Sequence, residues 1–313
     1  MAAYIVRRLL STVLVMVLVG VFVFLLLHIA PGDPAAIIAG NNATPAEITA
    51  IRHELGLSDP LTVQFARWFW DLLHGNFGIS IFSDTPVITL IGQRLPATLS
   101  LTALTIGFAV ILAVAAGVVA AWKAGGLLDG LLMGFAALGF STPVFVVGYF
   151  LIYLFAIRLH WLPVEGYVPL REGAWPWLSH LILPAIALGL AYVALIARIT
   201  RASMLEVLAE DYIRTARAKG ASNSSVLFRH ALKNAGVPIV TVIGIGVALL
   251  ISGVVVTETV FNIPGVGRLA VDAITNRDYP IIQGVMVIFS GAYVVINLLV
   301  DLSYALIDPR VRY

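Results

Sequence analysis

Long apolar runs alternate with short polar connections along most of the chain. A helix that crosses a bilayer needs about 20 predominantly apolar residues, and six runs are of that order. They lie near Leu9–Ile29, Ala97–Trp122, Leu131–Ile157, Leu181–Ile199, Val237–Thr257 and Ile281–Ile307. The pattern therefore predicts an all-α polytopic membrane protein with six transmembrane helices.

The first apolar run follows Arg7 and Arg8 and has a second interpretation, as a cleavable secretory signal. The apolar core of such a signal is about 7–15 residues long, whereas Leu9–Ile29 has about the length of a bilayer span. The length favours a retained helix. We therefore expect residues 1–30 to form a short N-terminal tail and the first transmembrane helix.

Residues 31–96 form a connection that is too long for a simple turn, and we expect an extracytoplasmic loop with short helices. Pro45–Leu55 predicts one short helix. Val63–Leu73 predicts an amphipathic helix, and its aromatic residues, which include Trp68 and Trp70, suit the membrane interface. An aromatic anchor is the favoured interpretation, and a docking surface for an external partner is the alternative.

Residues 97–313 are expected to form a five-helix core, interrupted by a polar loop at 200–236. Apolar positions in this loop recur at helical spacing, at Leu205, Leu208, Tyr212 and Ala216. Cations crowd the end of the predicted helix, at Arg214, Arg217 and Lys219, and Gly220 follows them. Ser222 can cap a second helix that runs toward Pro238. The loop is therefore predicted to be a helix, a tight break and a helix, lying on the membrane surface with a basic face.

Composition supports a membrane protein and limits its chemistry. The chain has 313 residues, is 60% hydrophobic and has a mean hydropathy of +0.99. It has no cysteine, which excludes disulfides and cysteine nucleophiles, and its net charge of +2 is too small to indicate nucleic-acid binding.

The distribution of cations predicts the orientation. With the N-terminus inside, most loop cations fall on the cytoplasmic side, namely Arg7, Arg8, Lys123, Arg198, Arg201, Arg214, Arg217, Lys219, Arg229, Lys233, Arg310 and Arg312. Both termini are therefore expected to be cytoplasmic.

Motifs of enzymes and metal proteins are missing from the sequence. None of the three lysines follows a glycine in a phosphate-binding loop, no two histidines have metal-ligand spacing, and no G-x-S-x-G is present. We therefore predict no catalytic, cofactor-binding or metal-binding residue, and an intramembrane hydrolase is a remote alternative. An ion-coupled carrier is another alternative, but Asp129, Glu258 and Asp301 lie near the ends of spans, which favours anchoring and ion pairing over a proton relay.

One face of the fifth run carries small or weakly polar side chains, at Thr241, Ile245, Ala248, Ser252, Val255 and Thr259. Gly244, Gly246 and Gly253 add places where another backbone can approach closely. Plain helix packing explains such a pattern, and so does the wall of a path for a polar solute. Within this face we predict that Thr241, Ala248, Ser252 and Thr259 line a translocation path.

An ordered set of short motifs resembles one family from end to end. They are Tyr4-Ile5-Val6-Arg7-Arg8-Leu9-Leu10, Pro31-Gly32-Asp33-Pro34, Asn76-Phe77-Gly78, Arg94-Leu95-Pro96-Ala97-Thr98, Thr142-Pro143, Trp161-Leu162-Pro163, the run Tyr212 to Gly220, the run Phe261 to Gly267, Arg277-Asp278-Tyr279-Pro280 and the closing Asp308 to Tyr313. The chain resembles a permease subunit of bacterial ABC transporters of the dipeptide and oligopeptide branch. The resemblance implies the type I importer permease fold.

In such permeases the cytoplasmic loop holds the EAA motif, and its short coupling helix is implied to contact an ATPase subunit. Gly220 matches the glycine of the motif, whereas Arg214 stands where the motif has glutamate and Pro238 comes later than in sugar importers. The implied ATPase-coupling residues are Tyr212, Arg214, Ala216, Arg217, Lys219, Gly220, Ala221 and Ser222.

The resemblance also implies a cellular location, a set of partner subunits and a solute. The chain would be a non-catalytic subunit in the bacterial inner membrane, surrounded by lipid. Its implied partners are a second homologous permease, two ATPase subunits and an extracytoplasmic substrate-binding protein. The implied solute is a peptide, and relatives of this branch carry haem, nickel chelates or glutathione instead.

Overall fold

The chain folds almost entirely into helices. The computed structural model describes residues 2–29, 33–39, 43–54 and 56–307, except for some side chains within these ranges. Within this part of the chain the only β pairing is an isolated bridge between Ile79 and Pro86. The all-α prediction is therefore confirmed.

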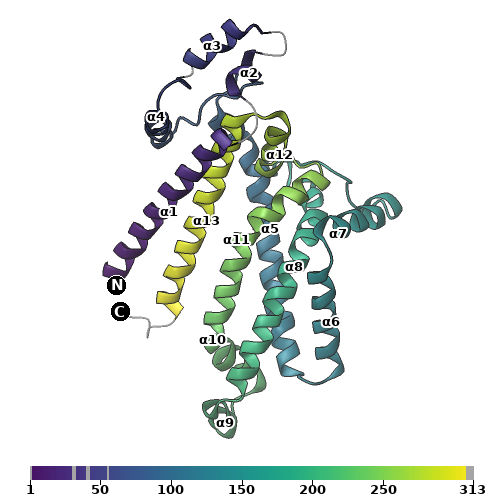
Figure 1. Ribbon diagram of the computed structural model, residues 1–313. Coiled ribbons are helices and arrows are strands. Elements are labelled where there is room, and N and C mark those ends of the chain that lie inside the picture. The colour runs from purple at the N-terminus through teal and green to yellow at the C-terminus, as the bar shows by residue number, and fades with distance from the viewer. Residues whose placement is uncertain (1, 30–32, 40–42, 55, 308–313) are drawn as a thin grey trace. The chain divides into compact units, whose positions relative to one another are not determined.

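The helices follow one another as labelled in Figure 1. They are α1 (Ala2–Ile29), α2 (Pro34–Ala39), α3 (Pro45–Glu54), α4 (Leu61–Leu73), α5 (Val87–Trp122), α6 (Leu127–Ser141), α7 (Val144–Leu151), α8 (Ala174–Leu208), α9 (Asp211–Ala218), α10 (Leu232–Asn234), α11 (Gly236–Val260), α12 (Val266–Asn276) and α13 (Tyr279–Ile307). Two π-helical segments, Ile152–Arg158 and Ser225–Ala231, continue α7 and precede α10, and a 3₁₀ turn lies at Leu170–Glu172.

Each predicted apolar run falls on helical structure. In the described part of the chain, α5, α8 and the Tyr279–Leu302 part of α13 are long and apolar enough to cross a membrane, and α1 carries a shorter apolar stretch, Leu10–Leu26. Two bent helix pairs add two further candidate spans. The structure thus supports three to five spans by length and composition, and the count of six stays a prediction.

The third run is not one continuous helix, and its assignment as a span stays a prediction. The chain bends by 104° between α6 and the segment Val144–Arg158. Pro143 disfavours the helical conformation of the residue before it, and Thr142 accordingly has an extended backbone with φ −92° and ψ 126°. A pattern of apolar residues cannot show this break, because both sides of it are apolar.

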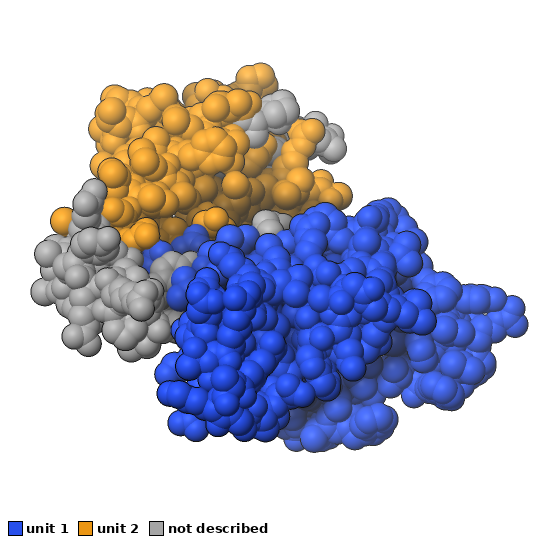
Figure 2. All heavy atoms as spheres, turned by 90° about the horizontal axis from the view of Figure 1, so that it is seen from below, with its two compact units in different colours: residues 1, 96–268, 295–313 blue, residues 2–95, 269–294 orange. Residues whose placement is uncertain are grey.

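The chain divides into two compact units, coloured in Figure 2. Unit 1 holds residues 96–268 and the end of α13 from Val295, and unit 2 holds residues 2–95 and 269–294. In unit 1, α8 packs against α6, α7 and α11 and buries residues along most of its length.

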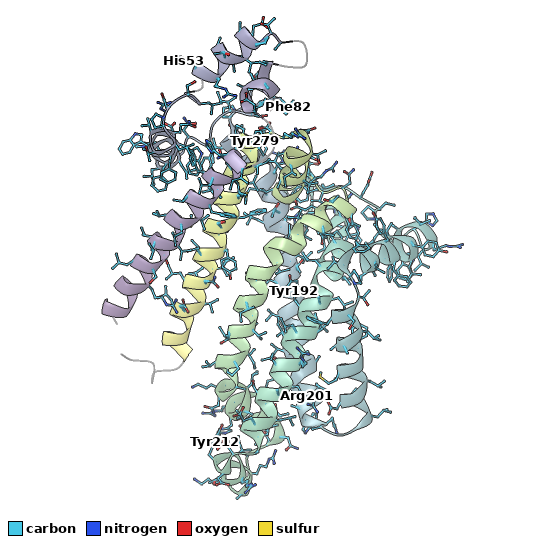
Figure 3. The ribbon with its side chains drawn as sticks, viewed as in Figure 1. His53, Phe82, Tyr192, Arg201, Tyr212 and Tyr279 are labelled. Carbon is cyan, nitrogen blue, oxygen red and sulfur yellow. The ribbon has the colours of Figure 1, made fainter. Side chains whose placement is uncertain are left out.

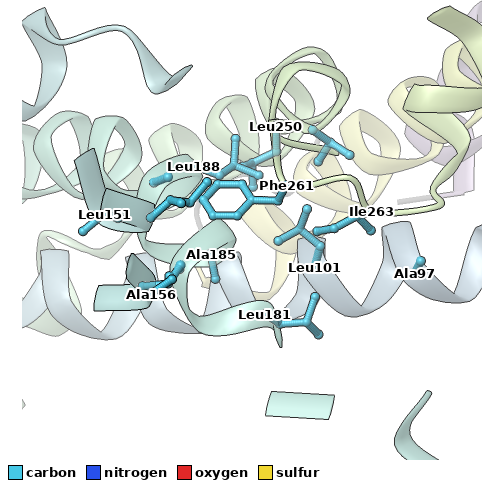
Figure 4. Close-up of a cluster of buried hydrophobic side chains, with 14 residues drawn as sticks. Ala97, Leu101, Leu151, Ala156, Leu181, Ala185, Leu188, Leu250, Phe261 and Ile263 are labelled. Atoms are coloured by element: carbon cyan, nitrogen blue, oxygen red, sulfur yellow. The ribbon is translucent and has the colours of Figure 1, made fainter. Parts of the chain in front are cut away.

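The core of unit 1 is built from α5, α7 with its π-helical continuation, α8, α11 and the loop after α11. Figure 4 shows Phe261 and Ile263 of that loop among Leu101, Leu188 and Leu250. Lipid is as apolar as leucine, so packing in a bilayer stabilises through close contact rather than through transfer from water. Small residues provide that contact. A Cβ at Gly253 would lie 2.7 Å from Leu188, and one at Gly117 would lie 2.7 Å from the carbonyl oxygen of Ala197.

Unit 2 joins α1 to the predicted loop helices. The α3 and α4 predictions are confirmed within one or two residues at each end that the structure describes. Thr44 and Glu47 exchange hydrogen bonds in a capping box at the start of α3, and these bonds lower the pKa of Glu47. Phe24 of α1 lies 5.4 Å from Phe65 and 5.9 Å from Trp68 of α4, measured between ring centroids.

Candidate functional site

The predicted coupling loop begins later than the sequence indicated. Helix α8 continues through residues 200–208 and ends at Leu208. Glu210 has an extended backbone and lies at the N-cap position of a separate α9, without a capping hydrogen bond from its side chain. The expected stripe through Leu205, Leu208, Tyr212 and Ala216 is therefore broken by the turn at Ala209 and Glu210. Ile213, which that stripe did not include, is the residue of α9 that is fully buried.

The break and the second helix agree with the prediction. Gly220 has φ +82°, a left-handed conformation that glycine adopts without a steric penalty. The Ser222 hydroxyl accepts a hydrogen bond from the Ser225 backbone N–H at 3.3 Å, which is the geometry of an N-cap. The following helical turns lead through α10 into α11.

The α9 surface is polar and basic. Arg214, Arg217, Lys219, Gly220 and Ser222 are exposed, whereas Ala216 and Ala221 are half-buried. Arg214 pairs with Asp211 at 3.2 Å, and because both side chains are exposed this pair adds little stability. Tyr212 is partly exposed, and burial together with the charge of Glu210 raises the pKa of its phenol, which stays neutral.

Ile213 fastens α9 to the long helices of unit 1. It packs in a cluster with Met204 of α8, with Val118 and Ala121 of α5, and with Val226 in the segment after Gly220. Figure 3 follows α8 from Tyr192 through Arg201 to the loop that carries Tyr212. A displacement of α9 would therefore pull on α5 and α8 together.

The predicted path residues lie on α11. Thr241 is half-buried and Thr259 is exposed, and each hydroxyl donates to a carbonyl oxygen four residues earlier, at 2.7 and 2.9 Å. The side chains of Ala248 and Ser252 lie outside the described part of the structure. Ile245 and Val256 on the same side are 51% and 42% exposed, whereas Val255 packs against Gly267, so within unit 1 this face is partly exposed.

The opposite side of α11 packs against the rest of unit 1. A Cβ at Gly246 would lie 3.4 Å from Tyr192, and Gly253 lies against Leu188. The glycines thus serve packing, as the plainer interpretation expected, while the path assignment on the other face stays a prediction.

Glu258 at the end of α11 forms a buried network that sequence analysis did not foresee. The side chain is fully buried and accepts hydrogen bonds from the Thr98 hydroxyl at 2.6 Å and the Arg268 backbone N–H at 2.9 Å. The Thr98 oxygen accepts from the Val266 backbone N–H at 2.8 Å. The carboxylate therefore sits at the N-terminus of α12, where a negative charge is favoured. Its position at a span end gave only a weak signal.

Asp129 and Arg201 join α6 to α8 by a two-pronged ion pair. Arg201 Nε donates to Oδ1 at 2.6 Å and a terminal guanidinium nitrogen donates to Oδ2 at 2.7 Å. This confirms the expectation that Asp129 is an ion-pairing residue. Arg198, one helical turn away, also lies inside α8 rather than in a loop beyond it.

Together these features define a helical membrane protein whose basic surface loop is packed on its long helices. Residues 113–313 match the family model of the binding-protein-dependent transport system inner membrane component, and residues 1–102 match the N-terminal model of such membrane components. The chain belongs to this family.

Named relatives cover the whole chain. It is 62% identical over 313 residues to the "Probable peptide ABC transporter permease protein y4tP" of Sinorhizobium fredii, with 100% of both chains covered. It is 44% identical over 313 residues, again with full coverage of both, to the glutathione transport system permease protein GsiC of Escherichia coli K12.

A solved structure shares the fold. The inward-facing MetNI methionine ABC transporter aligns with a TM-score of 0.58 at 16% identity, over 71% of this chain and 97% of that chain. The predicted importer permease fold is thereby confirmed. The family places the chain in the inner membrane, as a permease component of an ABC importer that works with ATPase and substrate-binding proteins.

Proposed function

We propose that this chain forms half of the path of an ATP-driven peptide importer and receives force from an ATPase subunit through α9. The observation that carries the proposal is the basic α9 surface fastened by the buried Ile213 to α5 and α8. The name of the relative that is 62% identical supports a peptide as the solute.

The proposed assembly has four kinds of subunit. A second, homologous permease completes the path, two ATPase subunits bind the α9 loops, and an extracytoplasmic binding protein delivers the peptide. Both termini and α9 lie on the cytoplasmic side, as the cation distribution predicts. ATP-driven approach of the ATPases draws the loops together and opens the path outward. The chain itself is non-catalytic.

Glutathione is a second candidate solute, because the full-length relative GsiC is named for it. It belongs to the same chemical class, a short peptide with free carboxylates, so the mechanism is unchanged. Ion coupling is less favoured, because Asp129 is bound by Arg201 and Glu258 is hydrogen-bonded at the α12 N-terminus.

Uptake into proteoliposomes tests the proposal. The chain is reconstituted with its companion permease, ATPases and binding protein, and labelled di- and oligopeptides are supplied. We expect uptake that vanadate stops and a protonophore spares. Uptake that survives vanadate and fails with the protonophore would instead establish an ion-coupled carrier, and peptide cleavage without uptake would establish a hydrolase.

The docking surface has a separate test. Reversing charge at Arg217 and Lys219, both exposed on the α9 loop, should leave membrane insertion intact and weaken co-purification of the ATPases by about tenfold. Arg171 is the control, since its side chain is 84% exposed and lies just before the start of α8, at the other end of that helix. Normal recovery of ATPases with the Arg217→Glu/Lys219→Glu variant would rule out this surface.

A further inference from the structure

A cavity of about 190 Å³ lies between α6 and α8 within unit 1. Met133, Phe140 and Ser141 of α6 and Leu195 and Arg198 of α8 form its walls. The remaining lining residues are alanines, whose small side chains leave the space open. The cavity is therefore apolar apart from one hydroxyl and one guanidinium.

Arg198 is exposed and has no carboxylate within ion-pair distance among the residues that the structure describes. Its guanidinium carbon lies 5.9 Å from the centre of the Phe140 ring. Asp129 is the one acidic residue of α6, and its oxygens are already bound by Arg201 and by the Gly125 backbone N–H at 2.9 Å. Two arginines one turn apart on α8 thus differ. Arg201 is paired with the Asp129 carboxylate, whereas Arg198 faces a cavity.

The cavity is lined by helical residues of α6 and α8 and not by the loops that follow them. Phe140 is thirteen residues beyond Leu127, the first residue of α6, which corresponds to about 20 Å along the helix. Arg198 is ten residues before the end of α8, and helical side chains tilt toward the N-terminus, so its guanidinium points away from that end. An arginine within a membrane helix is costly unless it meets water or an anion.

We propose that the Arg198 cavity is a solute subsite that binds a carboxylate of the transported peptide during passage. This inference rests on the proposed function, which supplies a solute with a free carboxylate. The guanidinium offers a planar set of donors that matches a carboxylate, and Ser141 adds a hydroxyl. A volume of about 190 Å³ admits a terminal carboxylate with a few attached atoms, not a whole peptide. A lipid phosphate is the other oxyanion in a membrane, and the labelling experiment below distinguishes it from the peptide carboxylate.

Labelling of a single cysteine tests the subsite directly, because the chain has no cysteine of its own. Ala137 lines the cavity and is exposed, so Ala137→Cys in the assembled complex is treated with an anionic and a cationic methanethiosulfonate. We expect both reagents to react, and transported peptide to slow the reaction. Adding Arg198→Met should lower the ratio of anionic to cationic rates by about tenfold, since the local positive charge is lost.

Three results would overturn the subsite. Failure of both reagents to react would show a cavity without water, an unchanged rate ratio would show that Arg198 does not act on the cavity, and protection by anionic lipid but not by peptide would assign the site to a headgroup.

Transport gives the second readout. Arg198→Met should slow peptide uptake by the complex about tenfold, because the charge-assisted hydrogen bond to the carboxylate is lost. Arg198→Lys keeps part of that bond and should therefore retain more of the uptake. Lys123→Met is the matched control, since Lys123 lies over Trp122 at the end of α5, outside the cavity. Full uptake by Arg198→Met would reject the subsite while leaving the importer intact, whereas absence of peptide uptake by the unaltered complex would reject the importer itself.

Discussion

The hydroxyl of Thr98 connects α5 to the start of α12 through two hydrogen bonds. It donates to the buried carboxylate of Glu258 and accepts from the Val266 backbone N–H. Thr98→Val keeps the shape and removes both bonds, and each buried group left unsatisfied costs about 1–3 kcal/mol. We expect a clear loss of thermal stability of the purified protein in detergent, with most of it restored in Thr98→Ser. Equal melting temperatures for Thr98→Val and the unaltered chain would show that the network is not stabilising.

Gly265 is required by the same network for a steric reason. A Cβ at this position would meet the Glu258 carboxylate, which is fixed by its hydrogen bonds. Gly265→Ala should therefore lower the free energy of unfolding by about 1–3 kcal/mol, the usual cost of overpacking.

Gly134 in α6 is the matched control, since a Cβ there meets nothing within 4 Å. Gly134→Ala should be neutral or stabilising, because alanine has the higher helix propensity. Denaturation by heat, followed by loss of helical signal, compares the two variants. A destabilised Gly134→Ala beside an unaffected Gly265→Ala would contradict the steric explanation.

At the scale of elements, α9 depends on one buried side chain. Ile213→Ala removes its packing against Met204 and Val118 and should cost about 2–5 kcal/mol locally. We expect faster hydrogen exchange of the backbone of α9 (Asp211–Ala218) in mass spectrometry, with the rest of unit 1 little changed. Arg217→Ala, at an exposed position of the same helix, should leave the exchange of α9 nearly as it was. If the backbone of α9 exchanged hydrogen at the same rate in both variants, α9 would be held in place by other contacts.

The local sequence predicted the break and the second helix of the coupling loop, but it did not predict the buried residue that holds α9 in place. Gly220 and Ser222 act through their own backbone conformation and hydroxyl, so the sequence alone located the break and the second helix. Ile213 is buried because α5, more than ninety residues earlier, supplies Val118 and Ala121. A helical wheel of the loop contains no information about that partner.

The same distinction between local and long-range information applies to the membrane spans and to the sites within them. Apolar length located helices in all six predicted regions, because a bilayer demands it. The Thr98–Glu258 bond joins residues 160 positions apart, and the Arg198 cavity needs α6 and α8 to meet. Neither pairing follows from composition or periodicity, which describe one segment at a time.

At the scale of the whole molecule, a transport mechanism makes its most specific prediction about the face of α11 that carries Thr241 and Thr259. Thr241 and Thr259 lie on that face near opposite ends of the helix, eighteen residues or about 27 Å apart, which is close to the thickness of the hydrocarbon core. A path that opens alternately to the two sides cannot expose both positions to water equally in one state.

Single cysteines at these two positions report the two openings, because the chain contains no other cysteine. We expect Thr241→Cys to react with a water-soluble thiol reagent in the nucleotide-free complex and to lose reactivity after trapping with ATP and vanadate, and Thr259→Cys to change in the reverse direction. Ile111 on α5 is 75% exposed and apolar, so Ile111→Cys should face lipid and stay unreactive in both states. If Thr241→Cys and Thr259→Cys are as inert as Ile111→Cys throughout the cycle, this face of α11 packs against lipid or a neighbouring subunit, and the path must lie elsewhere.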